Sequence, residues 1–107
     1  MTRVFVLFNL KEGVSEADYE AWAKATDIPN VRALKSVEGF EVFKSTGLMG
    51  ADGTPPYAYF EVIDVTDMAQ LGEDASSETM QKVAGEFQAL ADNPVFIMTE
   101  NLESGAA

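Results

Sequence analysis

Residues 15–32 read Ser15-Glu-Ala-Asp-Tyr-Glu-Ala-Trp-Ala-Lys-Ala-Thr-Asp-Ile-Pro-Asn-Val-Arg32, and this stretch decides the fold class of the chain's first half. Ser15 is a good N-cap residue, and Asp18 three positions later completes a helix start signal. Apolar and small side chains then recur at helical spacing, which predicts one buried helix face. These residues are Tyr19, Trp22, Ala23 and Thr26.

Pro29 interrupts this periodic run. Proline has no backbone N–H, and its ring disfavours helical geometry at the preceding residue, Ile28. We therefore expect the helix to end near Asp27 and a shorter helical turn to follow over residues 29–36. Such a break would place an acid directly before it and Arg32 directly after it.

The segments on either side of this stretch predict strands and a second helix. Residues 3–10 are apolar on both alternating faces, which is typical of a central strand that is covered twice. Residues 39–45 alternate in a way that suits an edge strand. We expect a third strand over residues 57–65 and a last strand over residues 95–100. Ser76 or Ser77 can cap a helix that runs to about Ala91.

The resulting order, β-α-β-β-α-β, predicts an α+β, ferredoxin-like fold with a four-stranded antiparallel sheet. We expect one domain over residues 1–101 and a flexible tail over 102–107. Residues 46–56 are a loop by composition, either a plain hairpin connection or a mobile cover. Both crossovers of this topology lie on one side, so the other sheet face stays apolar and open. We expect a homodimer in which these faces pack together.

Composition excludes several classes of function. The 107 residues include no Cys and no His, which removes thiolate chemistry, His-dependent catalysis and the usual zinc ligands. We therefore expect no metal and no cofactor. A net charge of −11 disfavours nucleic acid and anionic membrane surfaces as partners. No apolar run is long enough to span a bilayer, and we expect a cytoplasmic protein.

The first 45 residues also resemble a known family. The residues that carry the resemblance are Asn9-Leu10-Lys11, Gly13-Val14, Asp18-Tyr19-Glu20, Trp22, Thr26-Asp27-Ile28-Pro29, Val31-Arg32, Leu34, Ser36-Val37 and Phe40-Glu41-Val42. This pattern is similar to the REDY-like, HapK-type branch of the dimeric α+β barrel superfamily. The resemblance implies a role in pathways for prodiginine-type pigments and related aromatic natural products. It also implies kinship with cofactor-free oxygenases, cyclases and dehydratases that act on bulky planar molecules.

Without His or Cys, proton transfer falls to Asp, Glu, Tyr or Lys. Asp27 is either a cap of the turn after Pro29 or a catalytic acid or base. Glu61, in the third strand, is either exposed at an edge or faces a cavity, where burial would make it a useful base. Arg32 is either a surface ion-pair partner or a residue whose guanidinium binds a carboxylate or carbonyl of the ligand.

Four further residues are candidates for substrate binding. Asn9 is a strand-end polar residue or a group that orients a ligand carbonyl. Tyr19 and Trp22 are part of the apolar core, or line a wall that binds an aromatic ligand, or do both. Tyr59 lies on the same strand face as Glu61. Together with what the resemblance implies, these residues lead to the hypothesis of a cofactor-free enzyme that moves protons during cyclisation, dehydration or condensation of a planar aromatic molecule. The alternative is a barrel that binds a small molecule, or a protein partner, without catalysis.

Overall fold

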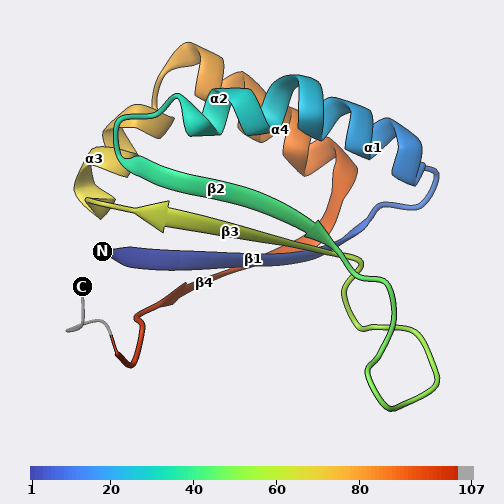
Figure 1. Cartoon of the computed structure of the whole chain (residues 1–107). Coiled ribbons are helices and arrows are strands. Elements are labelled where there is room, and N and C mark those ends of the chain that lie inside the picture. The colour runs from blue at the N-terminus through green and yellow to red at the C-terminus, as the bar shows by residue number, and fades with distance from the viewer. Residues whose placement is uncertain (104–107) are drawn as a thin grey trace.

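Four antiparallel strands form one sheet in the order β2-β3-β1-β4, and the helices all lie on one of its faces (Figure 1). This computed structural model describes residues 1–103. The elements along the chain are β1 (Thr2–Leu10), α1 (Glu16–Trp22), the π-helical segment η1 (Ala23–Asp27), α2 (Ile28–Arg32), β2 (Val37–Lys44), β3 (Tyr59–Val65), α3 (Met68–Ala75), α4 (Glu78–Leu90) and β4 (Ala91–Thr99). The predicted α+β, ferredoxin-like topology is confirmed, with β1 central and β2 at an edge.

The helices begin where side-chain caps were expected. The Ser15 hydroxyl accepts a hydrogen bond from the Asp18 N–H at 3.1 Å, which satisfies one of the free donors at the start of α1. The Ser77 hydroxyl does the same for Met80 at 3.2 Å at the start of α4. These bonds are local in sequence, so residue type and spacing were enough to predict them.

The predicted break at Pro29 is wrong, because the chain stays helical through Arg32. In η1 the Ile28 N–H bonds to the Ala23 carbonyl five residues back, and this forms a wider turn than an α-helix has. The α-helix then restarts with Pro29 in its first turn, where a missing N–H removes no helical hydrogen bond. Asp27 makes no side-chain capping bond here, so the interpretation of Asp27 as a cap is also wrong.

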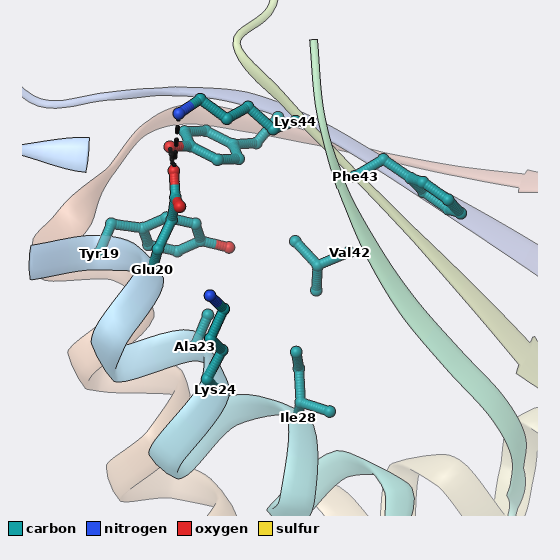
Figure 2. Close-up of a pocket in the computed structure, with 9 residues that line it drawn as sticks. Tyr19, Glu20, Ala23, Lys24, Ile28, Val42, Phe43 and Lys44 are labelled. Atoms are coloured by element: carbon teal, nitrogen blue, oxygen red, sulfur yellow. Dashed lines mark hydrogen bonds and ion pairs between the residues drawn. The ribbon is translucent and has the colours of Figure 1, made fainter. Parts of the chain in front are cut away.

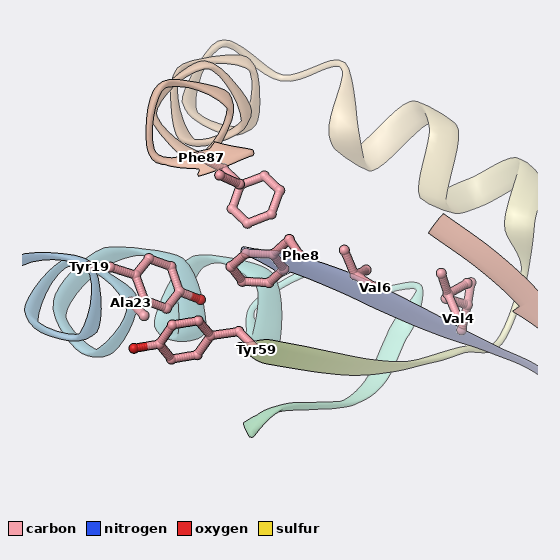
Figure 3. Close-up of a cluster of buried hydrophobic side chains, with 9 residues drawn as sticks. Val4, Val6, Phe8, Tyr19, Ala23, Tyr59 and Phe87 are labelled. Carbon is pink, nitrogen blue, oxygen red and sulfur yellow. The ribbon is translucent and has the colours of Figure 1, made fainter. Parts of the chain in front are cut away.

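The core lies between the helices and the sheet and is rich in aromatic rings (Figure 3). Phe8 of β1 is fully buried and stands edge-on to Tyr19 and Phe87, with ring centroids 5.5 and 5.0 Å apart. Tyr59 of β3 stacks on the same ring at 5.6 Å. Each such pair adds about 0.5–1.5 kcal/mol to the burial of its surface, so this cluster fixes how α1 and α4 pack on the strands.

No helix covers the opposite face of the sheet (Figure 1). We call it the open sheet face; its apolar residues are Phe5, Leu7, Phe43, Phe60, Val62, Val95 and Ile97. Phe43, Val95 and Ile97 are 48, 40 and 45% exposed, respectively. The two crossovers therefore leave one face bare, as the topology requires.

The last strand and the tail differ from expectation at their boundaries. β4 begins at Ala91, directly after α4, rather than at residue 95. The expected flexible tail covers 102–107, of which 104–107 lie outside the described residues. Within residues 1–103, none of the helices has both the length and the apolar character needed to cross a membrane.

Candidate functional site

A cavity of about 250 Å³ lies between the sheet and the helices α2, α3 and α4. Its walls are mostly apolar, with Phe40 and Ile63 on the sheet side and Leu71 and Phe87 on the helix side. Phe96 of the edge strand β4 also lines it and is 61% exposed, so the cavity reaches solvent on this side. The polar side chains among its described lining residues are Asp27, Glu61 and Gln88.

Glu61 reaches this cavity because of strand alternation. It lies on the helix-covered face of the inner strand β3, and only 5% of it is exposed. Its neighbours across the sheet are Val6 on β1 and Val42 on β2. A carboxyl between two valines has no neighbouring strand side chain that could solvate its charge, and burial of this kind favours the neutral acid.

Asp27 reaches the same cavity because of the π-helical turn. It is the last residue of η1 and is also only 5% exposed. The wide turn shifts the helical register of the residues around it, and the side chain faces the sheet rather than a helix end. The structure thus brings together two acids that are far apart in sequence.

The carboxyls of Asp27 and Glu61 lie next to each other in the cavity wall, within reach of a shared hydrogen bond. Burial raises the pKa of Glu61, and the negative charge of Asp27 and the bond to it raise that pKa further. Burial also raises the pKa of Asp27, although its bond with Glu61 opposes the shift. Two adjacent buried carboxyls do not both ionise easily, so the pair holds one proton between them at neutral pH. Glu61 is the carboxyl that holds this proton, because burial and the charge of Asp27 both raise its pKa.

Apart from this shared proton, the pair lacks hydrogen-bond donors. Asp27 Oδ2, Glu61 Oε2 and the Tyr19 hydroxyl are buried without a partner among the described residues. Burial, followed by the charges of Glu61 and Asp27, raises the pKa of Tyr19, which places this hydroxyl close to the pair. Buried polar groups are usually satisfied, and exceptions in native proteins concentrate at sites of function.

A smaller cavity of about 120 Å³, lined by Tyr19, lies between η1 and the end of β2 (Figure 2). Three of its polar side chains already bond to one another. The Tyr59 hydroxyl donates to Glu20 at 2.7 Å, and Lys44 lies 3.0 Å from the same carboxylate. Tyr59, expected to bind substrate beside Glu61, therefore lines this second cavity instead of the larger one.

The remaining predicted site residues serve the fold at other places. The Asn9 amide donates to the Pro56 carbonyl at 3.0 Å and accepts from the Ala58 N–H at 2.9 Å, which ties the β2–β3 loop to β1. The Trp22 indole N–H donates to Glu86 at 2.9 Å and links α1 to α4. Neither side chain lines the larger cavity.

Arg32 also lies outside the larger cavity. Its Nε donates to the Phe40 carbonyl at 3.0 Å, so the guanidinium binds the edge strand β2. Among residues 1–103 no three His, Cys, Asp or Glu side chains come together as metal ligands would. The arrangement therefore offers acid–base chemistry through Asp27 and Glu61, next to an apolar space.

The sequence reasoning missed the far wall of the cavity. Met80, Val83 and Phe87 recur at helical spacing along α4, and they pack inward against the cavity. Gln88, next to these residues, and Phe96 were not recognised as lining residues. An apolar stripe looks the same in a sequence whether it meets side chains or a cavity, so no local signal was available.

A family model described as REDY-like protein HapK matches residues 2–102. The crystal structure of HapK from Hahella chejuensis is similar over 100% of this chain and 98% of that one, with a TM-score of 0.77 and 29% identity. No curated protein sequence matches the chain.

Two more distant structures show the same fold. A dimeric ferredoxin-like protein of unknown function from Thermobifida fusca is 14% identical, with a TM-score of 0.70 over 94% of this chain and 90% of that one. A protein described as an antibiotic biosynthesis monooxygenase is 12% identical, with a TM-score of 0.68 over 95% and 99% of the two chains. At these identities the likeness concerns the fold alone.

Proposed function

Because this chain belongs to the REDY-like HapK family, we propose that it is a cofactor-free acid–base enzyme acting on a planar, largely apolar small molecule. The observation that carries the proposal is the placement of Asp27 and Glu61, two buried carboxyls that lie together in the wall of an apolar cavity. Buried carboxyls with shifted pKa values are typical of general acids and bases.

The pair offers an acid and a base at the same place. In a dehydration, the Asp27 carboxylate takes a proton from carbon, and Glu61 gives its proton to the departing hydroxyl, which leaves as water. Asp27 is then protonated and Glu61 ionised. Transfer of one proton across the hydrogen bond between them restores the starting state. Cyclisation and condensation need the same two transfers.

The cavity fits a small, flat ligand. Its volume of about 250 Å³ lies just below the usual range for small-molecule sites, which limits the ligand to a small one. Phe40, Phe87 and Phe96 line it with ring faces and edges against which a planar molecule can pack. The proposal gives no role in substrate contact to Arg32, Asn9 or Trp22, since none of them lines the cavity and each has a hydrogen bond elsewhere.

We also propose that the enzyme is a homodimer joined through its open sheet face. The related fold from Thermobifida fusca is described as dimeric. Burying about 400 Å² of apolar surface on each subunit would contribute on the order of 10 kcal/mol per subunit before association costs. This packing would leave the cavity accessible, because the cavity lies on the opposite side of the sheet.

A non-catalytic binding protein is the second candidate, and the nearly uniform apolar lining favours it. Catalysis of hydrogen–deuterium exchange at carbon distinguishes an acid–base enzyme from a binding protein. This test needs no knowledge of the natural substrate. 2-Indanone is a planar ketone with acidic C–H groups, and its exchange in D₂O can be followed by proton NMR. We expect the wild type to accelerate this exchange, and Asp27→Asn and Glu61→Gln to lose about 100-fold or more of the acceleration.

Binding of the probe must be measured on the same samples. We expect both site variants, Asp27→Asn and Glu61→Gln, still to bind 2-indanone, since the apolar walls of the cavity are unchanged. The control is Glu12→Gln, which makes the same charge change at an exposed position in the turn between β1 and α1. It should leave the exchange rate of 2-indanone unchanged. Wild-type exchange rates in both site variants would refute the catalytic proposal and leave the binding protein.

A further inference from the structure

We propose that the natural ligand carries a protonated nitrogen, which the Asp27–Glu61 pair binds while the ring lies in the apolar part of the cavity. This inference rests on the proposed function only in taking the large cavity as the ligand site. It names a chemical class that family membership does not specify.

The charge distribution around the cavity leads to this class. All seven lysines and arginines of the chain lie within residues 1–103, and none lines the cavity that holds the Asp27–Glu61 pair. Lys24 and Lys44 line the small one, and the Arg32 guanidinium is bonded to β2. The pair therefore carries about one negative charge in an apolar wall without a cation of the protein to balance it. A buried charge of this kind favours an opposite charge strongly.

The hydrogen bonds lead to the same class. Ionised carboxyls only accept, and Asp27 Oδ2 and Glu61 Oε2 have no donor from the rest of the described chain. The neighbouring groups are neutral: Val6 on β1, Val42 on β2 and Gln88 on α4. The Tyr19 hydroxyl of α1 can supply a single hydrogen. An amidinium or ammonium group supplies several N–H donors and the missing charge together.

Anionic ligands are disfavoured by the same features. A carboxylate on the ligand would add a second or third negative charge beside the pair, in a protein whose net charge is already −11. A cationic ligand, in contrast, balances the single negative charge that the pair carries at neutral pH while Glu61 keeps its proton. Affinity for a cation should rise further as the pH approaches the Glu61 pKa of about 9, because the pair then gains a second negative charge.

Three probes with one ring test the inference: benzamidine, which is cationic, benzamide, which is neutral, and benzoate. Their dissociation constants can be measured by NMR titration of the full chain at pH 6.5 and 8.5 with added salt, which screens surface attraction. At pH 8.5 we expect benzamidine to bind at least about tenfold more tightly than benzamide, a difference of about 1.4 kcal/mol. Benzoate should bind most weakly, and only benzamidine should gain affinity from pH 6.5 to 8.5.

The double variant Asp27→Asn/Glu61→Gln should bring benzamidine to the affinity of benzamide, whereas Glu12→Gln should preserve the preference. Benzoate binding as tightly as benzamidine would overturn the inference. So would a cation preference that survives in the double variant, or a lack of binding by all three probes. A preference for benzamidine without 2-indanone exchange would refute the enzyme and keep the inference, so the two failures are distinguishable.

Discussion

Replacing Glu61 by Gln should make the protein more stable at neutral and alkaline pH. Glutamine resembles the protonated acid in shape, and its amide can donate to the Asp27 carboxylate as Glu61 does. The wild-type side chain, in contrast, must keep a proton that water would remove. The substitution thus removes a free-energy cost that the folded state carries, and the cost grows with pH.

The magnitude follows from the pKa of Glu61, which burial and the charge of Asp27 raise from 4.5 to about 9. The folded state binds more protons than the unfolded chain between these values, so stability falls as pH rises through this window. One pKa unit corresponds to about 1.4 kcal/mol, and at pH 7 the full difference would be about 3 kcal/mol. We expect Glu61→Gln to gain roughly 1–3 kcal/mol at pH 7–8 and almost nothing at pH 4.

Urea unfolding at pH 4.5, 7 and 8.5, at one protein concentration, measures this effect. Few other groups titrate between pH 6 and 8.5, because the chain has no His and no Cys, so a change in stability over this interval can be assigned to the Asp27–Glu61 pair. Wild type should lose stability over this interval, and Glu61→Gln should lose much less. The surface variant Glu12→Gln should follow the wild type. Parallel curves for wild type and Glu61→Gln, or a less stable variant at pH 8.5, would refute the reasoning.

Other expected outcomes follow from the same structure. Ile97→Glu places a charge on an exposed position of the open sheet face and should convert a dimer into a folded monomer near 11.6 kDa; light scattering of wild type as a clean monomer at micromolar concentration would contradict the dimer. Tyr19→Phe removes a hydroxyl that has no partner, so unfolding free energy should change by less than about 1 kcal/mol; a larger loss would mean that the hydroxyl is bonded in solution. Elemental analysis should find no stoichiometric zinc, iron or copper, and a chelator should leave the melting temperature unchanged; about one metal per chain would overturn this expectation.

The features that sequence could predict are those governed by nearby residues. Ser15 and Ser77 cap helices because a hydroxyl three residues before a free N–H is the right partner at almost any helix start. The alternation of side chains along residues 57–65 predicted that Glu61 lies on the same strand face as Tyr59. Both residues are buried in the structure, which confirms this prediction. The β-α-β-β-α-β order then predicted the sheet.

The candidate site could not be predicted in full, because it depends on one irregular turn. Pro29 was expected to end the helix, whereas the wider η1 turn accommodates it and directs Asp27 towards the sheet. One extra residue in a turn rotates every following side chain by about 100°. Arg32 looked free in the sequence, but the carbonyl of Phe40 lies within reach only once β2 is in place. Contacts between distant residues decide both outcomes.

The central claim is that Asp27 and Glu61 share one proton at neutral pH. Carbon-13 NMR of the side-chain carboxyls, followed from pH 4 to 10, observes that proton directly. We expect the Glu61 carboxyl carbon to keep the chemical shift of a protonated acid at pH 7 and to titrate far above the ordinary range, since burial raises the pKa of Glu61 to about 9. The Asp27 carbon should sense the same step. If both carbons already show ionised carboxylates at pH 7 and titrate near pH 4, the shared proton does not exist, and the acid–base proposal fails with it.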